Sequence, residues 1–327
     1  MAPEVSGAHP VEDLADLRVV ALGGGHGLSA SLSALRHVVS DLTAVVTVAD
    51  NGGSSGRLRR EFGVLPPGDL RQALAALCGD DDWGRTWARV LQHRFSSDGE
   101  MDKHAVGNLL IVALWELLGE HVDGLDWVGR LLGAQGRVLP MSVAPIDIIA
   151  AVRGIDPDDR HALRTVRGQV EVASTSGQVV SVALEPKEPP ACPEALVAVN
   201  AADWVVLGPG SWFTSVIPHL LVPELREALV TSRARKVVTL NLEPQTGETD
   251  GFSPENHLEV LGSHAPDLKL DVVLADRKSV VDPEQLRATA ASFGADLVVA
   301  DVAAEDGSPR HDPVKLANAY AGILREA

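Results

Sequence analysis

The sequence predicts a doubly wound, mostly parallel α/β fold of the Rossmann-like kind, with a helical insertion. Short runs of β-branched and apolar residues recur along the chain, and each is nearly continuous, as strands buried on both faces of a parallel sheet require. A glycine-rich turn and an amphipathic helical pattern follow the first run. With 327 residues, 45% of them hydrophobic, the chain can also build a full core.

Six runs are expected to form the strands of this sheet. They span residues 18–22, 44–49, 204–207, 236–240, 271–274 and 296–300. After the first run, Leu28, Leu32, Leu35 and Val39 recur at helical spacing, so one stripe of that helix should face the sheet. Residues 138–152 and 169–184 read as further strands and turns.

Two segments depart from this alternation of strand and helix. Residues 1–16 are acidic and aperiodic, and we expect a disordered tail there, followed by one α/β domain over 17–327. Residues 69–136 are helical in pattern and predict a helical subdomain, with helices at 70–78, 83–93, 106–118 and 125–133. Four tryptophans lie in this region and are expected to anchor it on the sheet, namely Trp83, Trp87, Trp115 and Trp127.

Charge and composition exclude several classes of protein. The chain holds 28 basic and 45 acidic residues, a net charge of −17, so nucleic acid and anionic membranes are not expected partners. Cys78 and Cys192 are too few for a disulfide framework or a zinc site. The first residues do not resemble a signal peptide, and no apolar run reaches the ~18 residues of a membrane span. We therefore expect a cytoplasmic protein.

The first predicted strand runs into the sequence GGGHGLS at 23–29. Its glycines allow a ligand to approach the backbone, and the helix that follows presents free N–H groups to an anion. It is not a P-loop, and Leu28 occupies the position where a dinucleotide fingerprint needs a small residue. The loop therefore predicts an anion or nucleotide site with contacts from Gly24, Gly25, His26 and Gly27.

The second predicted strand runs into DNGGSSGRLRR at 50–60. Three glycines, two hydroxyls and three arginines within this loop predict a second anion cradle. The candidate contacts are Asp50, Asn51, Gly53, Ser54, Ser55 and Arg57. An acid at the end of the second strand would also suit an NAD ribose, although an adenosine pocket needs no such cradle. A flexible loop with solvated arginines is the remaining interpretation.

Two later strands also end in loops rich in glycine and hydroxyl groups, GPGSWFTS at 208–215 and NLEPQTGETD at 241–250. The third loop contributes Gly210, Ser211 and Thr214 as candidate contacts. Because the carboxyl ends of parallel strands meet at one edge of a sheet, all four loops should gather there. Open α/β sheets bind ligands at that edge, at a topological switch point.

Other polar residues are candidates for the same region. Asp69 follows Pro-Pro-Gly and fits a helix N-cap better than a catalytic acid. His104 and Asn108 open another predicted helix and are candidate ligand contacts. Asp50 and Asp69, with Glu248 and Asp250 in later loops, could hold a divalent cation that bridges phosphates. Mg²⁺ is therefore left open as a cofactor, with Asp50 and Asp69 as its candidate ligands.

Long, ordered segments resemble the gluconeogenesis factor family (YvcK-like proteins), in the superfamily of the 2-phospho-L-lactate transferases (CofD-like). The segments are VVALGGGHGLSASLSALR, VTVADNGGSSGRLRREFGVLPPGDLRQALAAL, HAVGNLLIVAL, GRVLP, ADWVVLGPGSWFTSVIPHLLV and NLEPQTGETDGFSPENHLE. They run from residue 18 to about 259, and a weaker match lies at Arg310-His311-Asp312.

This resemblance implies a Rossmann-like core, a cytoplasmic homodimer and binding of a UDP-sugar such as UDP-N-acetylglucosamine. It also implies a role in cell-wall synthesis and cell shape on gluconeogenic carbon sources. The ligand-binding positions that it transfers are Gly24, Gly25, Gly27, Asn51, Ser54, Ser55, Gly210, Ser211 and Thr214. Arg310 becomes a candidate partner of the diphosphate, which a guanidinium can bind with two hydrogen bonds.

The sequence departs from the family pattern at several of these positions. His26 stands where the family usually has Thr, Asn51 where it has a second Asp, and Lys103 where it has Gly. The third and fourth loops also differ, with Trp212-Phe213 for Leu-Tyr and Glu243-Pro244 for Met-Thr. Loss of the acid at Asn51 removes a metal ligand, which favours a regulatory ligand site over metal-dependent transfer.

Three functions stay open at this point. We expect a UDP-sugar-binding regulatory protein without turnover, acting through a protein partner. The alternative is a transferase of the phospholactate type, in which backbone donors and arginines stabilise phosphate charge and Asp50 or Asp69 holds a divalent ion. An NAD-dependent dehydrogenase is the third. No catalytic residue is assigned.

Overall fold

The computed structural model describes residues 14–245 and 247–326. Most of the predicted disordered tail, residues 1–13, lies outside the described residues. Residues 14–16 form a turn, and Leu14 is buried against the core. The packed part of the chain therefore includes the last residues of the predicted tail.

Seven parallel strands form the central sheet, in the order β10-β9-β8-β7-β1-β2-β3. Their bounds are β1 Arg18–Gly23, β2 Asp41–Val46, β3 Arg137–Pro140, β7 Trp204–Leu207, β8 Arg235–Thr239, β9 Val272–Asp276 and β10 Asp296–Ala300. The predicted Rossmann-like α/β fold is confirmed. The second strand lies earlier than expected, because residues 47–49 already belong to the loop that follows it.

The strand order places a topological switch point between β1 and β7. From β1 the chain adds β2 and then β3 on one side, and it later returns to pair β7 with the other side of β1. The connections that leave the carboxyl ends of β1 and β7 therefore run to opposite faces of the sheet, and a ligand crevice is expected at this edge.

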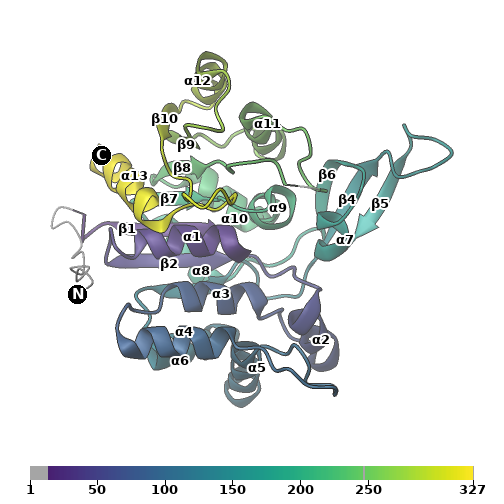
Figure 1. Cartoon of the computed structure of the whole chain (residues 1–327), viewed down its shortest axis with the longest axis vertical. Helices are drawn as coiled ribbons and strands as arrows, with labels where there is room; N and C mark the ends of the chain where they lie inside the picture. The colour runs from purple at the N-terminus through teal and green to yellow at the C-terminus, as the bar shows by residue number, and fades with distance from the viewer. Residues whose placement is uncertain (1–13, 246, 327) are drawn as a thin grey trace.

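Helices cover both faces of this sheet (Figure 1). On one face, α1 (Gly25–Leu35) packs between α3 (Gly68–Ala76) and α13 (Pro313–Arg325). The opposite face carries α8 (Pro193–Ala201), α9 (Ile217–Leu221) and α10 (Pro223–Thr231). The β9–β10 end is covered by α11 (Pro254–His264) and α12 (Pro283–Ser292).

The predicted helical region holds α3 together with α4 (Asp82–Gln92), α5 (Val106–Leu118) and α6 (His121–Leu132), and α2 (Gly53–Phe62) precedes it. Two of its tryptophans meet the expectation of core anchors, since Trp115 is buried and the half-buried Trp87 packs against the core. Trp115 is 4% exposed, whereas Trp83 is 54% and Trp127 is 53% exposed. The prediction is wrong for Trp83 and Trp127, because they lie on the outer faces of α4 and α6.

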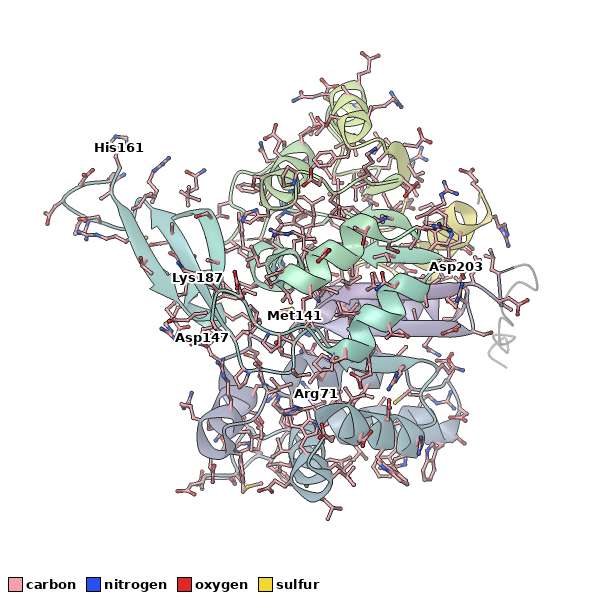
Figure 2. The ribbon with its side chains drawn as sticks, turned by 180° about the vertical axis from the view of Figure 1, so that it is seen from behind. Arg71, Met141, Asp147, His161, Lys187 and Asp203 are labelled. Atoms are coloured by element: carbon pink, nitrogen blue, oxygen red, sulfur yellow. The ribbon has the colours of Figure 1, made fainter. Side chains whose placement is uncertain are left out.

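A second, antiparallel sheet projects from one end of the molecule (Figure 1). Its order is β5 (Leu163–Arg167), β4 (Asp147–Arg153) and β6 (Gln178–Glu185), with α7 (Gln169–Ala173) between β5 and β6. Figure 2 places His161 at its tip and Asp147 at its base. Burial alternates along β4, which means that one face packs and the other is solvated.

None of the described helices combines the length and the apolar character that crossing a lipid bilayer requires.

Candidate functional site

The loops after β1 and β7 meet backbone against backbone at the switch point. A Cβ atom on Gly27 would collide with the carbonyl oxygen of Pro209 and would lie 2.5 Å from Cα of Gly210. Gly25 and Gly210 also have positive φ values of 55° and 139°. Glycine is therefore required here by close approach and by conformation, which explains why both loops are rich in it.

A cavity of about 480 Å³ opens beside this junction. We call it the switch-point pocket. It is lined by His26, Gly27, Ala30, Pro209, Gly210, Asn241, Leu242, Glu243, Pro244, Gln245, Pro309, Arg310 and His311. Four predicted contacts thus lie together at one cavity, since His26, Gly27, Gly210 and Arg310 all line it.

The N-terminus of α1 at this pocket can accept an anion. Gly24 is the N-cap residue, it supplies no side-chain cap, and the first turn has no acidic residue. The positive end of the helix dipole and the first amides lie near the pocket, and the acidic side chain that faces this N-terminus is Asp69 of α3, which interacts with the backbone of Gly25.

Arg310 lies at the rim of the switch-point pocket, on the loop before α13. Its side chain is 72% exposed, and its guanidinium binds Asp306 at 2.7 Å and the hydroxyl of Ser308 at 2.9 Å. These partners are its near neighbours in sequence, and an exposed ion pair of this kind contributes little free energy. The guanidinium can therefore leave Asp306 and bind a phosphate instead.

Asn241 holds the third loop in place, although the sequence analysis did not select it. Its Oδ1 accepts from the N–H of Gly210 at 2.9 Å, and its Nδ2 donates to the carbonyl oxygen of Gly210 at 2.9 Å. The sequence did hold a signal for Asn241, because this amide side chain directly follows a predicted buried strand at the edge where the glycine-rich loops gather. Ser211 accepts from Nε2 of Gln245 at 3.3 Å, and the buried Thr214 does not line the pocket.

The second loop builds a buried network with α5. The hydroxyl oxygen of Ser54 accepts from Nδ2 of Asn108 at 3.0 Å and from the N–H of Ala105 at 3.3 Å. Its own proton therefore points to Nδ1 of His104, 3.1 Å away, which leaves the His104 proton on Nε2. Burial and the charge of Arg57 lower the pKa of His104, so the ring is neutral. Asn108 also accepts from Nε of Arg71 at 2.9 Å.

Other candidates of the second loop bind protein groups. Gly53, at φ 46°, begins α2. Asn51 donates to Glu171 at 2.7 Å and accepts from the N–H of Val170 at 3.0 Å, which ties the loop to α7. Arg57 donates to the carbonyl oxygens of Glu100 and Asp102.

The three arginines of this loop do not gather at one point. Arg59 and Arg60 line a separate cavity of about 380 Å³ together with Arg167, and Arg59 pairs with Asp147 at 2.7 Å. All three arginines follow the start of α2.

Asp50 and Asp69 form an acid pair near the first loop. Oδ2 of Asp69 would lie 2.8 Å from a Cβ on Gly24, and Oδ2 of Asp50 would lie 2.9 Å from a Cβ on Gly68. Burial, and then the charge of Asp50, raises the pKa of Asp69 to about 7. The N-cap interpretation of Asp69 is wrong, because Pro67 is the N-cap of α3 and Asp69 turns toward the first loop instead.

The four acids named from the sequence do not converge. Burial raises the pKa of Glu248 to about 7, but this carboxyl lies against Trp212 and Thr214 of the π-helical turn η1 (Trp212–Val216). Asp250 accepts from the N–H of Gly247 at 3.0 Å. Over residues 14–245 and 247–326, no group of three or more His, Cys, Asp and Glu side chains could hold a metal ion.

The acid pair still fits one kind of metal site. Oδ2 of Asp69 is buried and has no hydrogen-bond partner among the described residues. Mg²⁺ commonly binds one or two carboxylates and takes its remaining ligands from water and phosphate. Asp50 and Asp69 therefore fit a magnesium ion carried in with a phosphate ligand, and not one enclosed by protein groups.

The sheet and its crevice define a doubly wound α/β protein of the Rossmann-like class, with its candidate site at the switch point. Within that class, the chain belongs to the CofD family: the family of 2-phospho-L-lactate transferase CofD matches residues 19–312.

Relatives and solved structures agree with this membership. A Mycobacterium tuberculosis protein described as "putative gluconeogenesis factor" is 53% identical over 308 residues, which cover 93% of this chain and 90% of the relative. A Listeria innocua protein described as "gluconeogenesis factor" is 34% identical, covering 94% of this chain and 95% of the relative. The crystal structure of a UPF0052-family protein from Bacillus halodurans is 34% identical and matches with a TM-score of 0.81, covering 93% of this chain and 98% of that one.

Proposed function

We propose that this protein binds a nucleoside diphosphate sugar of the UDP-N-acetylglucosamine class in the switch-point pocket. It acts as a regulatory protein rather than as an enzyme, in the cytoplasm and as a homodimer, and it passes its ligand state to a protein partner. Its role is in cell-wall synthesis and cell shape during growth on gluconeogenic carbon sources. Relatives described as gluconeogenesis factors support the metabolic part of this proposal.

One observation carries the ligand class. The backbone junction of Gly27 with Pro209 and Gly210 admits no side chain, and the switch-point pocket opens beside it at the N-terminus of α1. Backbone amides, a helix dipole and the Arg310 guanidinium together suit a diphosphate. In a chain with net charge −17, a site that attracts an anion must be built locally in this way.

The buried acid pair favours a second candidate, a transferase that moves a phosphate-linked group from a nucleoside diphosphate. Asp50 and Asp69 would hold Mg²⁺, which when bound neutralises charge on phosphate oxygens. Asn51 leaves the pair without a third acid, and its amide is already bound to α7. The transferase is therefore the second candidate function.

Thermal unfolding separates the two candidates. The protein is heated with UDP-N-acetylglucosamine, UDP, GDP or NAD, each with and without Mg²⁺. A ligand at a thousand times its Kd stabilises the folded state by about 4 kcal/mol, which gives a clear rise in Tm. A rise with the UDP-sugar that persists without Mg²⁺ is expected. A rise that requires GDP or Mg²⁺ would support the transferase, and no rise with any ligand would contradict both.

A further inference from the structure

The two edge strands of the central sheet differ in how well they are covered. β3 ends the sheet on one side, and it is short, finishes in Pro140 and is buried over its last three residues. β10 ends the sheet on the other side (Figure 1), and each of its five residues is exposed or half-buried. We call the outer side of β10 the open edge.

The backbone of β10 alternates between its neighbour β9 and the open edge. The N–H of Asp296 donates to the β9 side at 2.9 Å, and the carbonyl oxygen of Ala300 accepts from that side at 2.8 Å. Val298 lies between them in the same register, so Leu297 and Val299 direct their N–H and C=O groups outward. Among the strands that the structure describes, none pairs with this outer side. The open edge therefore presents the hydrogen-bonding groups of two residues.

The open edge also lacks the features that usually protect an edge strand. The edge strand β5 of the small sheet carries Arg164 and Arg167 within five residues. The middle of β10 is Leu297-Val298-Val299, with no charge and no proline, and its pairing with β9 shows no register shift. An uncharged, apolar and regular edge of this kind pairs readily with a further strand.

We propose that the open edge pairs with the same edge of a second copy of this chain, antiparallel about a two-fold axis at Val298. This inference rests on the homodimer of the proposed function and assigns its interface. Leu297 of one copy lies opposite Val299 of the other, and each such pair exchanges two hydrogen bonds. All outward groups of both copies are then satisfied, because the pattern is its own complement under a two-fold rotation.

The charges at the two ends of β10 favour a second copy as the occupant. Asp296 is exposed at the first end, and the exposed Arg277 and Lys278 follow β9 at the other end. Neither cation has an ion pair in the described part of the chain, whereas Asp301 beside them is already paired at 3.0 Å. The antiparallel arrangement brings the negative end of each copy to the positive end of the other, which stabilises the pair.

Disulfide trapping tests the position of the two-fold axis. Residues that face each other on this axis have Cα atoms about 4.5 Å apart, which a disulfide can bridge. Val298→Cys should therefore become a covalent dimer under mild oxidation, at concentrations where the wild type sediments as a dimer. Val299→Cys is the matched control, because its two copies are offset along the strands beyond the ~7 Å limit and should stay unlinked. The native Cys78 and Cys192 are buried and do not compete.

Val299→Pro is a second variant that needs no oxidation. It removes an outward N–H and leaves the hydrogen bonds to β9 intact, a position at which an edge strand tolerates proline. It should sediment as a monomer at concentrations where the wild type is a dimer, with Tm showing that it is folded.

The outcomes separate the inference from the proposed function. If the wild type sediments as a monomer, the homodimer fails and the inference falls with it. If the wild type is a dimer but Val298→Cys is not cross-linked, Val299→Cys is cross-linked equally, or Val299→Pro stays dimeric, the inference alone is wrong. Calorimetry of UDP-N-acetylglucosamine tests the ligand independently, because none of the residues of β10 lines the switch-point pocket.

Discussion

Lys103 has a backbone conformation that suits glycine. Its φ is +62°, and it is the non-glycine residue with positive φ among the described residues. The left-handed region costs an L-residue about 1 kcal/mol. The exposed lysine side chain offers only an ion pair to Asp102 at 3.5 Å, which contributes little in return.

Lys103→Gly should therefore raise the free energy of unfolding by about 0.5–1 kcal/mol. Denaturant unfolding measures the change. Lys103→Ala is the control: it removes the same ion pair but keeps the Cβ atom, so it should not stabilise the protein. Equal stabilisation by both substitutions would show that conformation is not the cause.

Asp69 should make stability depend on pH. Burial and Asp50 raise its pKa from 3.8 to about 7, so the folded protein holds this proton more tightly than the unfolded chain does. Stability therefore falls as pH rises from about 4 to about 7 and is level above that range. Glu248, with a pKa raised to about 7 by burial, acts in the same direction.

Asp69→Asn should match the wild type near pH 4, where the carboxyl is protonated in the folded and the unfolded chain, and should exceed its Tm by a margin that grows up to about pH 7, because the amide carries no charge into the interior. Tm measured at several pH values tests this, with the exposed Asp267→Asn as control. If Tm changed with pH in the same way for the wild type and Asp69→Asn, the pH dependence could not come from the Asp69 carboxyl.

At the scale of elements, the junction between the β1 and β7 loops should tolerate no side chain. Gly27→Ala places a Cβ against the backbone of Pro209 and Gly210, which cannot move without disturbing both strands. We expect a loss of about 1–3 kcal/mol in unfolding free energy and loss of nucleotide binding. Gly322→Ala is the control, since nothing lies within 4 Å of its Cβ and α13 should gain up to about 1 kcal/mol. Unchanged binding in Gly27→Ala would contradict the role of the junction.

The elements of the central sheet were predictable because their signal is local. Strands such as β7 and β10 read as continuous apolar runs, and their predicted bounds match the observed ones. The antiparallel sheet was not defined in advance, because β5 is nearly all exposed and pairs with β4 alone, with ion pairs of Arg167 to Asp147 and Glu185 beside that pairing. Such pairs join distant positions, and a single sequence does not reveal them.

The candidate site was predictable in its loops and less so in its side chains. Glycine requirements are properties of the backbone, so Gly25, Gly27 and Gly210 could be selected from the sequence. Arg57 could not be assigned in this way, because its orientation depends on the turn of α2 from which it projects.

At the scale of the whole molecule, three parts meet at the carboxyl edge of the sheet. The helical region is attached through Ser54 and Asn108, and the small sheet through Asn51 and Glu171. The fourth loop also reaches the small sheet, since a Cβ on Gly247 would lie 2.7 Å from the carbonyl oxygen of Ala173. The loops at this edge of the sheet are therefore tied to every part of the molecule, and the fourth loop, which lines the switch-point pocket, connects it to the small sheet.

Titration calorimetry of UDP-N-acetylglucosamine without Mg²⁺ tests the central claim most directly. The wild type should bind one ligand per chain, and Arg310→Ala should raise the Kd roughly ten- to a hundredfold, because a charged hydrogen bond to phosphate is worth about 1.5–3 kcal/mol. Arg325→Ala, an exposed arginine at the other end of α13, should bind as the wild type does. Equal binding by wild type and Arg310→Ala, or no binding by the wild type, would contradict a UDP-sugar site at the switch point.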